Sequence, residues 1–265
     1  MLDGMSSQRE KAEELLRLHA APEPLVLVNA WDAASARVVA AAPGARAIAT
    51  ASWSIAAARG YPDGEAISRE EMIEGVRIVA AAVELPVTAD LERGFGDARL
   101  TLECAIEAGA VGCNLEDSDG KGGLWPAEEH AAVVAAARAA GDAAGVPIVI
   151  NARTDVFLTE VVPAEERVVA ALERGAAYLE AGADCIFVPF APDLATIETL
   201  AKEMGGPISV IGRAGGPRLA ELAQAGVARV SYGPGPMGVA MAALSRAAET
   251  LLAGGEPPAD LAFRL

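Results

Sequence analysis

The sequence predicts an α/β protein with a single (β/α)8 barrel of the TIM type, and three observations support this prediction. The chain has 265 residues, close to the ~250 typical of one such barrel. Short apolar or β-branched runs recur along it, each followed by a stretch with helical spacing, which is the pattern of βα units and a parallel sheet. Several helical stretches end in Ala-Gly-Ala or Ala-Gly-Val, where the glycine suits a helix end before the next strand.

Eight strands can be assigned in order, the number that closes such a barrel. They cover residues 25–30, 47–52, 86–91, 112–117, 147–153, 183–190, 207–212 and 229–233. Helices are expected between them at 70–83, 98–108, 127–144, 165–181, 194–204 and 216–225. We expect one more helix over about residues 6–19, outside the barrel proper, and a C-terminal helical extension at 239–265 after a Gly/Pro-rich turn. Residues 1–265 are therefore predicted to form one domain.

Composition and charge exclude several classes of function. A net charge of −16 argues against a nucleic-acid partner, because such binding needs a basic face that neutralises phosphates. No apolar run approaches the ~18 residues of a membrane span, and the first residues lack the basic-then-apolar order of a signal peptide. We therefore expect a cytoplasmic protein with no membrane partner. Cys104, Cys113 and Cys185 form no CxxC pair, so we expect buried free thiols rather than a disulfide or a zinc site.

Acidic side chains gather at the C-terminal ends of the third and fourth predicted strands, where barrel active sites lie. The third strand runs into Asp90 and Glu92, which period-two alternation puts on one side, and the fourth ends at Glu116 and Asp117. Four carboxylates therefore converge there, and three of them, Asp90, Glu92 and Glu116, could face one point above the barrel, where they would repel one another. A Mg²⁺ or Mn²⁺ ion removes that cost and prefers such hard oxygen ligands. The alternative is a structural ion network with the nearby basic residues Arg93, Arg153 and Lys121.

Two further features mark the same face of the barrel. Arg153 ends the fifth strand, and its guanidinium can hold a substrate carboxylate with two parallel hydrogen bonds. A salt bridge to Glu116 or Asp155 is the competing interpretation, and both roles can coexist. Gly94 and Gly96 flank a phenylalanine, which indicates a backbone that turns sharply or makes room for a ligand.

The chain resembles the isocitrate lyase and phosphoenolpyruvate mutase superfamily in a series of motifs that occur in one consistent order. These are NAWDAASA (29–36), TASWS (50–54), GYPD (60–63), ADLERGFG (89–96), NLED (114–117) and NARTD (151–155). The resemblance implies a barrel whose Mg²⁺ chelates the carboxylate and 2-oxo oxygen of a pyruvate-like unit. The ion stabilises an enolate while a C–C or C–P bond is broken or made. It also implies homotetramers, as dimers of dimers, in which a C-terminal helix is swapped between neighbouring barrels.

The resemblance also implies roles for single residues. Asp90 would bind Mg²⁺ directly or through a water, with Asp63, Glu92 and Glu116 completing the shell largely through waters. Arg153, Glu116 and Lys121 are the candidate catalytic residues. Substrate-contacting roles fall to Ser52 and the following Trp53 backbone, and to Asp63, Gly94, Arg153 and Tyr232.

The loop after the fourth strand departs from the family pattern and leaves the reaction open. Isocitrate and methylisocitrate lyases carry a Cys-Gly-His segment there, whereas residues 118–125 of this chain contain neither residue type. Ser118 stands where the phosphonate enzymes have a lysine. Lys121 could replace that lysine on a mobile loop, or it could be a solvated charge. His19 and His130 are expected at the surface, away from the chemistry.

Decarboxylation of an oxaloacetate-like 2-oxo acid needs a metal and a carboxylate clamp but no strong base, so it fits these residues best. A lyase that releases a 2-oxo acid is the second enzymatic interpretation. A C–P mutase or hydrolase acting on phosphonopyruvate is the third. A non-catalytic barrel that only binds a 2-oxo acid is the alternative from a different class.

Overall fold

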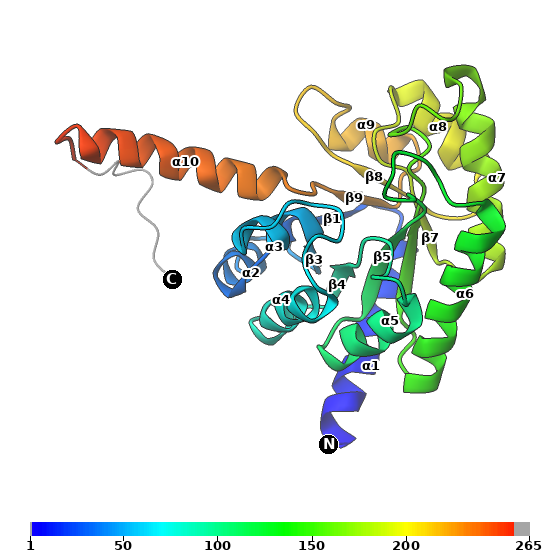
Figure 1. The fold of residues 1–265 in the computed structure, drawn as a ribbon, viewed down its shortest axis with the longest axis horizontal. Coiled ribbons are helices and arrows are strands. Elements are labelled where there is room, and N and C mark those ends of the chain that lie inside the picture. The colour runs from blue at the N-terminus through cyan, green and yellow to red at the C-terminus, as the bar shows by residue number, and fades with distance from the viewer. Residues whose placement is uncertain (1, 257–265) are drawn as a thin grey trace.

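A closed barrel of parallel strands forms the centre of the protein (Figure 1). The computed structural model describes residues 2–256. Within them, nine strand segments pair in the order β1-β9-β8-β7-β6-β5-β4-β3-β2. They are β1 (Leu25–Leu27), β2 (Asn29–Ala30), β3 (Ile48–Thr50), β4 (Val87–Asp90), β5 (Gly112–Glu116), β6 (Val149–Arg153), β7 (Cys185–Phe187), β8 (Ile208–Ile211) and β9 (Arg229–Ser231).

The eight predicted strands are confirmed, and the ninth segment arises because the first of them is divided. β1 pairs with β9 and β2 pairs with β3, so the two halves of this strand join the ends of the sheet and close the ring. All pairs are parallel. The C-terminal ends of all strands therefore meet at one face, the barrel mouth.

Helices surround this barrel and follow the predicted ranges closely. They are α1 (Leu2–His19), α2 (Ala33–Ala40), α3 (Ser52–Ala58), α4 (Arg69–Ala81), α5 (Ala98–Glu107), α6 (Ala127–Ala144), η1 (Ala164–Glu166), α7 (Arg167–Glu180), α8 (Leu194–Glu203), α9 (Leu219–Gln224) and α10 (Gly235–Leu252). Helices α2 and α3 were not predicted from the sequence. For α2 a signal was present, because Asp32 and Ser35 form a capping box in which the Asp32 carboxylate accepts from the Ser35 backbone at 2.7 Å.

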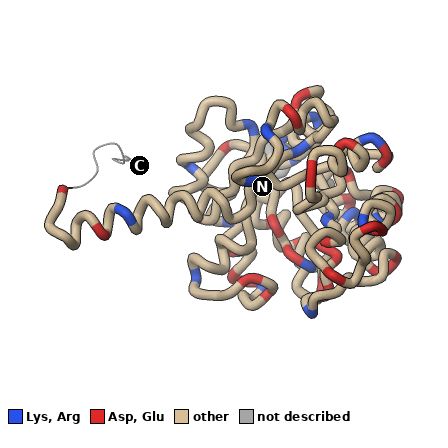
Figure 2. Tube along the Cα trace, turned by 90° about the horizontal axis from the view of Figure 1, so that it is seen from above, with Lys and Arg blue, Asp and Glu red and all other residues tan. Residues whose placement is uncertain are grey.

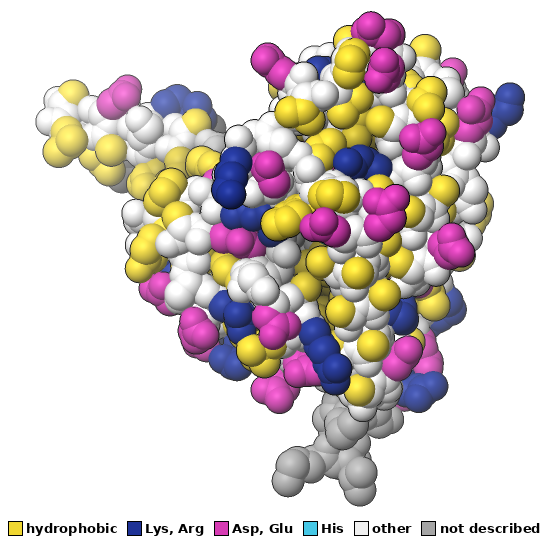
Figure 3. All heavy atoms as spheres, turned by 45° about the vertical axis from the view of Figure 1, so that its right-hand side comes forward, with side chains coloured by type: hydrophobic (Ala, Val, Ile, Leu, Met, Phe, Trp, Pro, Cys, Tyr) yellow, Lys and Arg dark blue, Asp and Glu magenta, His cyan; other side chains and the backbone are white. Residues whose placement is uncertain are grey.

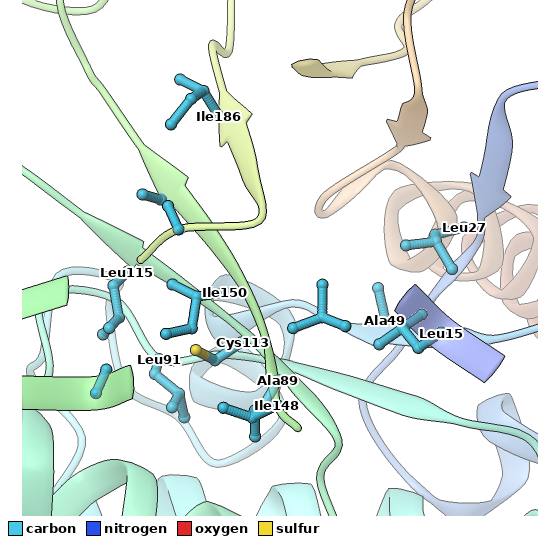
Figure 4. Close-up of a cluster of buried hydrophobic side chains, with 14 of the residues drawn as sticks. Leu15, Leu27, Ala49, Ala89, Leu91, Cys113, Leu115, Ile148, Ile150 and Ile186 are labelled. Atoms are coloured by element: carbon cyan, nitrogen blue, oxygen red, sulfur yellow. The ribbon is translucent and has the colours of Figure 1, made fainter. Parts of the chain in front are cut away.

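The main core fills the barrel and the layer between the strands and the helices (Figure 4). Many of its members are branched aliphatic side chains, such as Leu27, Leu115 and Ile150, all of them buried. Every strand is buried along almost its whole length, as expected for parallel strands covered on both faces. The mouth is where polar side chains interrupt this pattern.

The N-terminal helix α1 closes the opposite end of the barrel. It stands outside the βα alternation, as predicted, but Leu15 is buried in the main core. At Gly112, the first residue of β5, an added Cβ would lie 2.8 Å from Leu15 Cδ2, so only glycine lets the helix approach this closely. The Gln8 side chain donates to the carbonyls of Ile106 and Ala110 at 2.7 and 3.0 Å. These contacts fix α1 beneath the strands.

The C-terminal helix α10 projects away from the barrel (Figure 1). Few charged residues lie along it (Figure 2), and apolar side chains cover its surface (Figure 3). Val239 and Leu252 are 73% and 89% exposed, and Met237 is its one buried residue. An apolar groove of about 1030 Å³ runs between the base of α10 and the α2 side chains Val38 and Val39. Residues 8–256, whose side chains the structure describes, leave both surfaces uncovered.

Several expectations about single residues are wrong. His19 and His130 are not at the surface but only 3% and 2% exposed. His19 lies at the C-terminal end of α1, where its Nδ1 is 2.8 Å from the Leu15 carbonyl oxygen. The His130 ring packs edge-on against the Tyr178 ring. Cys113 and Cys185 are buried as predicted, whereas Cys104 is only partly buried. No helix within residues 2–256 has the length and apolarity needed to cross a membrane.

Candidate active site

Asp90 is held at the end of β4 by the neighbouring strand β3 and helix α3. The Ser52 backbone N–H and hydroxyl group both donate to Asp90 Oδ2, at 3.2 and 3.0 Å. The Asp90 backbone N–H donates to Thr50 Oγ1 at 2.9 Å. Ser52, predicted to contact the substrate, therefore contacts the predicted metal ligand in this structure.

Glu92 lies beyond the end of β4, so strand alternation does not determine where its side chain lies. β4 ends at Asp90, and Glu92 has a left-handed φ of 50°. Its Oε2 accepts from the Glu65 backbone N–H at 2.5 Å, and its Oε1 is buried without a partner. The Glu65 carboxylate in turn accepts from the Phe95 and Arg93 backbones at 2.7 and 3.1 Å. The loop before α4 and the loop after β4 thus fix each other.

Three of these positions have positive φ although none is glycine. Glu65, Glu92 and Phe95 have φ of 61°, 50° and 53°. Residues other than glycine rarely adopt this backbone conformation, and such strain persists only where the surrounding contacts enforce it. The strained positions lie together beside the carboxylates at the mouth.

Burial, and after it the neighbouring carboxylates, raises the pKa of three carboxyl groups at the mouth. Burial, and after it Asp90 and Asp63, raises the pKa of Glu92 to about 8. Burial also raises the pKa of Glu116 to about 7, with Asp155 and Asp90 adding to the effect and Arg153 and Arg93 opposing it. Partial burial and the Asp90 carboxylate raise the pKa of Asp63 as well. A hard divalent cation, for which carboxylate oxygens are suitable ligands, would relieve this repulsion.

The carboxylates do not form a complete cage for such an ion. Among the described side chains, no three Asp, Glu, His or Cys residues lie close enough together to hold one metal ion. Mg²⁺ commonly keeps several waters and uses only one or two carboxylates directly. The residues present therefore fit Mg²⁺ bound partly through waters, with the orphaned Glu92 Oε1 facing no competing donor.

Arg153 is engaged by both of its predicted salt-bridge partners. Its Nη1 lies 2.8 Å from Glu116 Oε2, and its Nη2 donates to Asp155 Oδ2 at 2.9 Å. Arg93 approaches Glu116 from the other side, with 3.7 Å between Nη1 and Oε1. The structural ion network considered above is therefore present at Glu116, and it places the guanidinium of Arg153 beside the carboxylate cluster.

Asp117 does not belong to the cluster, contrary to the prediction of four converging carboxylates. Period-two alternation turns it to the opposite side of the chain from Glu116, where it is fully buried. Its carboxylate accepts from the Asp155 backbone, Arg174 Nη1 and the Tyr178 hydroxyl at 2.8, 2.9 and 2.7 Å. Asp117 thus ties the segment after β5 to the segment after β6.

The remaining predicted residues lie around the mouth without converging on one point. Gly94 has a φ of 92°, and an added Cβ would lie 2.6 Å from the Ala98 Cβ, so its role is a close turn. Lys121 is exposed on the loop between β5 and α6. Trp53 is exposed on α3, and the Tyr232 backbone donates to Asn29 Oδ1 at 2.9 Å.

Glu65 is the functional-site residue that sequence reasoning missed. It lies two residues after Asp63 in the loop before α4, with no strand or motif to mark it. Its only sequence signal is a position in a glycine-containing turn, which many solvated glutamates share.

Comparison with known proteins gives the family. The model of the phosphoenolpyruvate phosphomutase family matches residues 15–252. The chain belongs to this family, within the isocitrate lyase and phosphoenolpyruvate mutase superfamily. A relative of uncharacterized function from Mycobacterium tuberculosis is 30% identical over 93% of this chain and 92% of its own. The 2-methylisocitrate lyase of Bacillus subtilis is 32% identical over 71% of this chain and 62% of its own length.

Solved structures agree with this membership in the phosphoenolpyruvate phosphomutase family. A Burkholderia cenocepacia protein provisionally assigned as a phosphonomutase is 48% identical, with a TM-score of 0.87 over 91% of this chain and 99% of that chain. The family match includes β4, β5 and β6 and the polar residues at their ends. Family members are lyases and mutases, so the chain is an enzyme of this superfamily.

Proposed function

We propose that the protein is a Mg²⁺-dependent enzyme that cleaves a C–C bond of a small 2-oxo or 2-hydroxy carboxylate through an enolate. The reaction is a decarboxylation of the oxaloacetate type or a cleavage that releases a 2-oxo acid. The observation that supports it is the group of mutually repelling carboxylates, Asp63, Asp90, Glu92 and Glu116, beside the guanidinium of Arg153.

The residues at the mouth have different roles in this reaction. Asp90, fixed by Ser52, and the other three carboxylates would hold the cation, partly through waters. When bound, Mg²⁺ would supply the positive charge that stabilises an enolate oxygen. Arg153 exchanges part of its contact with Glu116 for the substrate carboxylate. In a decarboxylation, the electron pair of the broken C–C bond enters the 2-oxo unit as the enolate and CO₂ leaves. In the cleavage of a 2-hydroxy acid, the hydroxyl group loses its proton and becomes the carbonyl of the released 2-oxo acid, and the electron pair enters the other fragment as its enolate. In both reactions the enolate carbon then takes a proton.

A second candidate is a C–P mutase or hydrolase acting on phosphonopyruvate, and its support is the 48% identical relative provisionally assigned as a phosphonomutase. The loop after β5 is where this candidate is weakest, since Ser118 replaces the lysine of the phosphonate enzymes and Lys121 is exposed.

Homotetramers with swapped C-terminal helices belong to the same proposal. The uncovered surface of α10 and the groove beside its base are both apolar, so each could cover the other in an assembly. In a tetramer built as a dimer of dimers, α10 of one chain would cover the groove of its neighbour and be covered in return.

Calorimetric titration of oxaloacetate, 2-oxoglutarate, phosphonopyruvate and oxalate, with and without Mg²⁺, tests the function. We expect Mg²⁺-dependent binding and turnover of one C–C substrate. Asp90→Ala should abolish this binding without unfolding the barrel, whereas Glu84→Ala, at an exposed position, should not change it. Tight binding without turnover would favour a non-catalytic barrel, and no Mg²⁺-dependent binding of any of the four compounds would refute the site.

A further inference from the structure

The inside of the barrel contains one charged side chain that the proposed reaction has not yet used. Arg229, the first residue of β9, is 1% exposed. Its Nη2 donates to Asn114 Oδ1 on β5 at 3.1 Å. β9 and β5 lie on opposite sides of the ring, because three strand positions separate them in either direction. A hydrogen bond between their side chains has to cross the interior, so the guanidinium of Arg229 lies inside the barrel.

This guanidinium lies beneath the candidate active site and close to Asp90. Asn114 is the register partner of Asp90 in the pairing of β4 with β5. Paired residues of neighbouring strands lie about 5 Å apart and point to the same side of the sheet. Asn114 also precedes Glu116 by two residues, which is one step of alternation below the mouth. The positive charge of Arg229 is therefore within about 10 Å of the Asp90 carboxylate.

No partner balances this charge. In the part of the chain that the structure describes, Arg229 Nε and Nη1 have no hydrogen-bond partner, and the partner of Nη2 is an amide rather than a carboxylate. Burial lowers the pKa of Arg229 to about 10, against the opposing effects of Cys185, Asp90 and Cys113, so the group stays charged at pH 7. An unpaired interior charge costs stability, and barrels of this kind are usually filled by branched apolar side chains. The stability of the fold therefore does not explain Arg229.

An anionic substrate gives this charge a role. The proposed substrate carries a carboxylate and forms an enolate, yet the mouth that receives it is lined by carboxylates. The two arginines at the mouth, Arg153 and Arg93, already contact Glu116. A positive charge buried beneath the mouth attracts an anion and repels a cation. Because the effective dielectric constant of a protein is well below that of water, both effects remain large at about 10 Å.

We propose that Arg229 is a positioning residue whose buried charge attracts the anionic substrate to the Mg²⁺-loaded site, and that it serves this site rather than the fold. The inference rests on the proposed function, because it requires Mg²⁺ and a 2-oxo acid at the mouth. The same charge weakens the binding of Mg²⁺ itself, since two cations repel each other. Removal of the charge should therefore shift the two affinities in opposite directions, whereas damage to the mouth would weaken both.

Calorimetry measures the two dissociation constants, that of Mg²⁺ with the free protein and that of oxalate with the Mg²⁺-loaded protein. Both are measured at about pH 8.5, where Arg229 keeps its charge and Glu92 is largely ionised. In Arg229→Met we expect Mg²⁺ to bind about tenfold more tightly and oxalate about tenfold more weakly. Asn114 Oδ1 keeps the hydrogen bond from Asn151 Nδ2 at 2.8 Å. Because replacement of a buried charge by an apolar side chain is often neutral or stabilising, urea denaturation should show no loss of stability.

Two further variants separate the charge from other effects. Arg229→Gln removes the charge but leaves a polar amide inside the barrel, so its two affinities should change as those of Arg229→Met do. Arg138→Met is the matched control. Arg138 is also a partly buried arginine, but it donates to the Ile148 and Gly182 carbonyls, which precede β6 and β7 at the end of the barrel opposite the mouth. Its loss should leave both affinities within about twofold of the wild type.

The outcomes separate this inference from the proposed function. If neither Mg²⁺ nor oxalate binds to the wild type, the proposed function fails and this inference fails with it. If both bind, and Arg229→Met leaves the two affinities unchanged or weakens both, Arg229 only fills the barrel and this inference alone is wrong. The same conclusion follows if Arg229→Gln binds both as the wild type does. A large loss of stability in both Arg229 variants would also contradict the inference, because the fold would then need the guanidinium.

Discussion

Removing the Asp117 carboxylate should be among the most destabilising single changes in this barrel. Asp117 is fully buried, and its two oxygens accept from the Asp155 backbone, Arg174 and Tyr178. The Arg174 side chain is only 15% exposed, so Asp117→Ala would leave a largely buried guanidinium without its counter-charge. Removal of one partner of a buried pair costs about 3–5 kcal/mol. We expect Asp117→Ala to lose that amount of unfolding free energy and Asp117→Asn to lose about half as much.

Urea denaturation at pH 7 measures this loss, with the slope of the transition checked for constancy. A double-mutant cycle with Arg174→Met tests whether the unpaired guanidinium causes this loss. The second change should remove the unpaired charge and restore part of the stability, with a coupling of about 1–3 kcal/mol. Because Asp117 fixes the Asp155 backbone, Asp117→Asn should also weaken Mg²⁺-dependent ligand binding through Arg153. A loss below about 1 kcal/mol for Asp117→Ala, or strictly additive losses, would refute the reasoning.

Three other outcomes are expected. Burial lowers the pKa of His19 and His130 to about 4, below an unfolded value of about 6.5, so their contribution is complete above pH 6.5 and lost as the pH falls toward 4. The raised pKa values of Glu92 and Glu116 act in the opposite direction, so the histidine effect is measured against the His19→Gln, His130→Gln double variant. In urea denaturation between pH 6.5 and 5, the wild type should lose stability relative to this variant by about 1.4 kcal/mol per pH unit for each histidine. Gly94→Ala should destabilise more than Gly122→Ala, since both have φ of 92° but only the first meets a neighbour; equal midpoints in urea would contradict this. Leu244→Asp, on the exposed surface of α10, should shift the sedimentation coefficient toward that of a monomer, with an unchanged circular dichroism spectrum.

The barrel could be predicted because the signals that define it are local. Each strand is a short apolar run, and helix ends such as Gly145, with φ of 68°, are marked by single residues. The division of the first strand at Val28 was not predictable, because residues 25–28 are uniformly apolar and only closure of the ring decides which neighbour each half pairs with.

The candidate site was predicted in part, and the errors have identifiable causes. Asp90, Glu116 and Arg153 could be placed because strand ends of a parallel barrel share one face. Asp117 was misplaced because it was grouped with Glu116 by sequence proximity, although alternation turns it the other way. The burial of His130 could not be predicted, since it depends on how α6 packs against its neighbours, and α6 begins with a polar stretch that reads as solvent-facing.

The left-handed conformations of Glu65, Glu92 and Phe95 have a consequence for the evolution of this protein. Each such residue costs on the order of 1–3 kcal/mol of local strain, and the three lie together at the mouth. A mutation to glycine would release part of that strain, but it would also remove side-chain contacts. At Glu65 it would remove the hydrogen bonds from the Arg93 and Phe95 backbones, and at Phe95 the packing against the buried side chains of Ile55 and Met72. These contacts offset the strain, so the shape of the loops at the mouth is maintained by side chains that glycine could not replace.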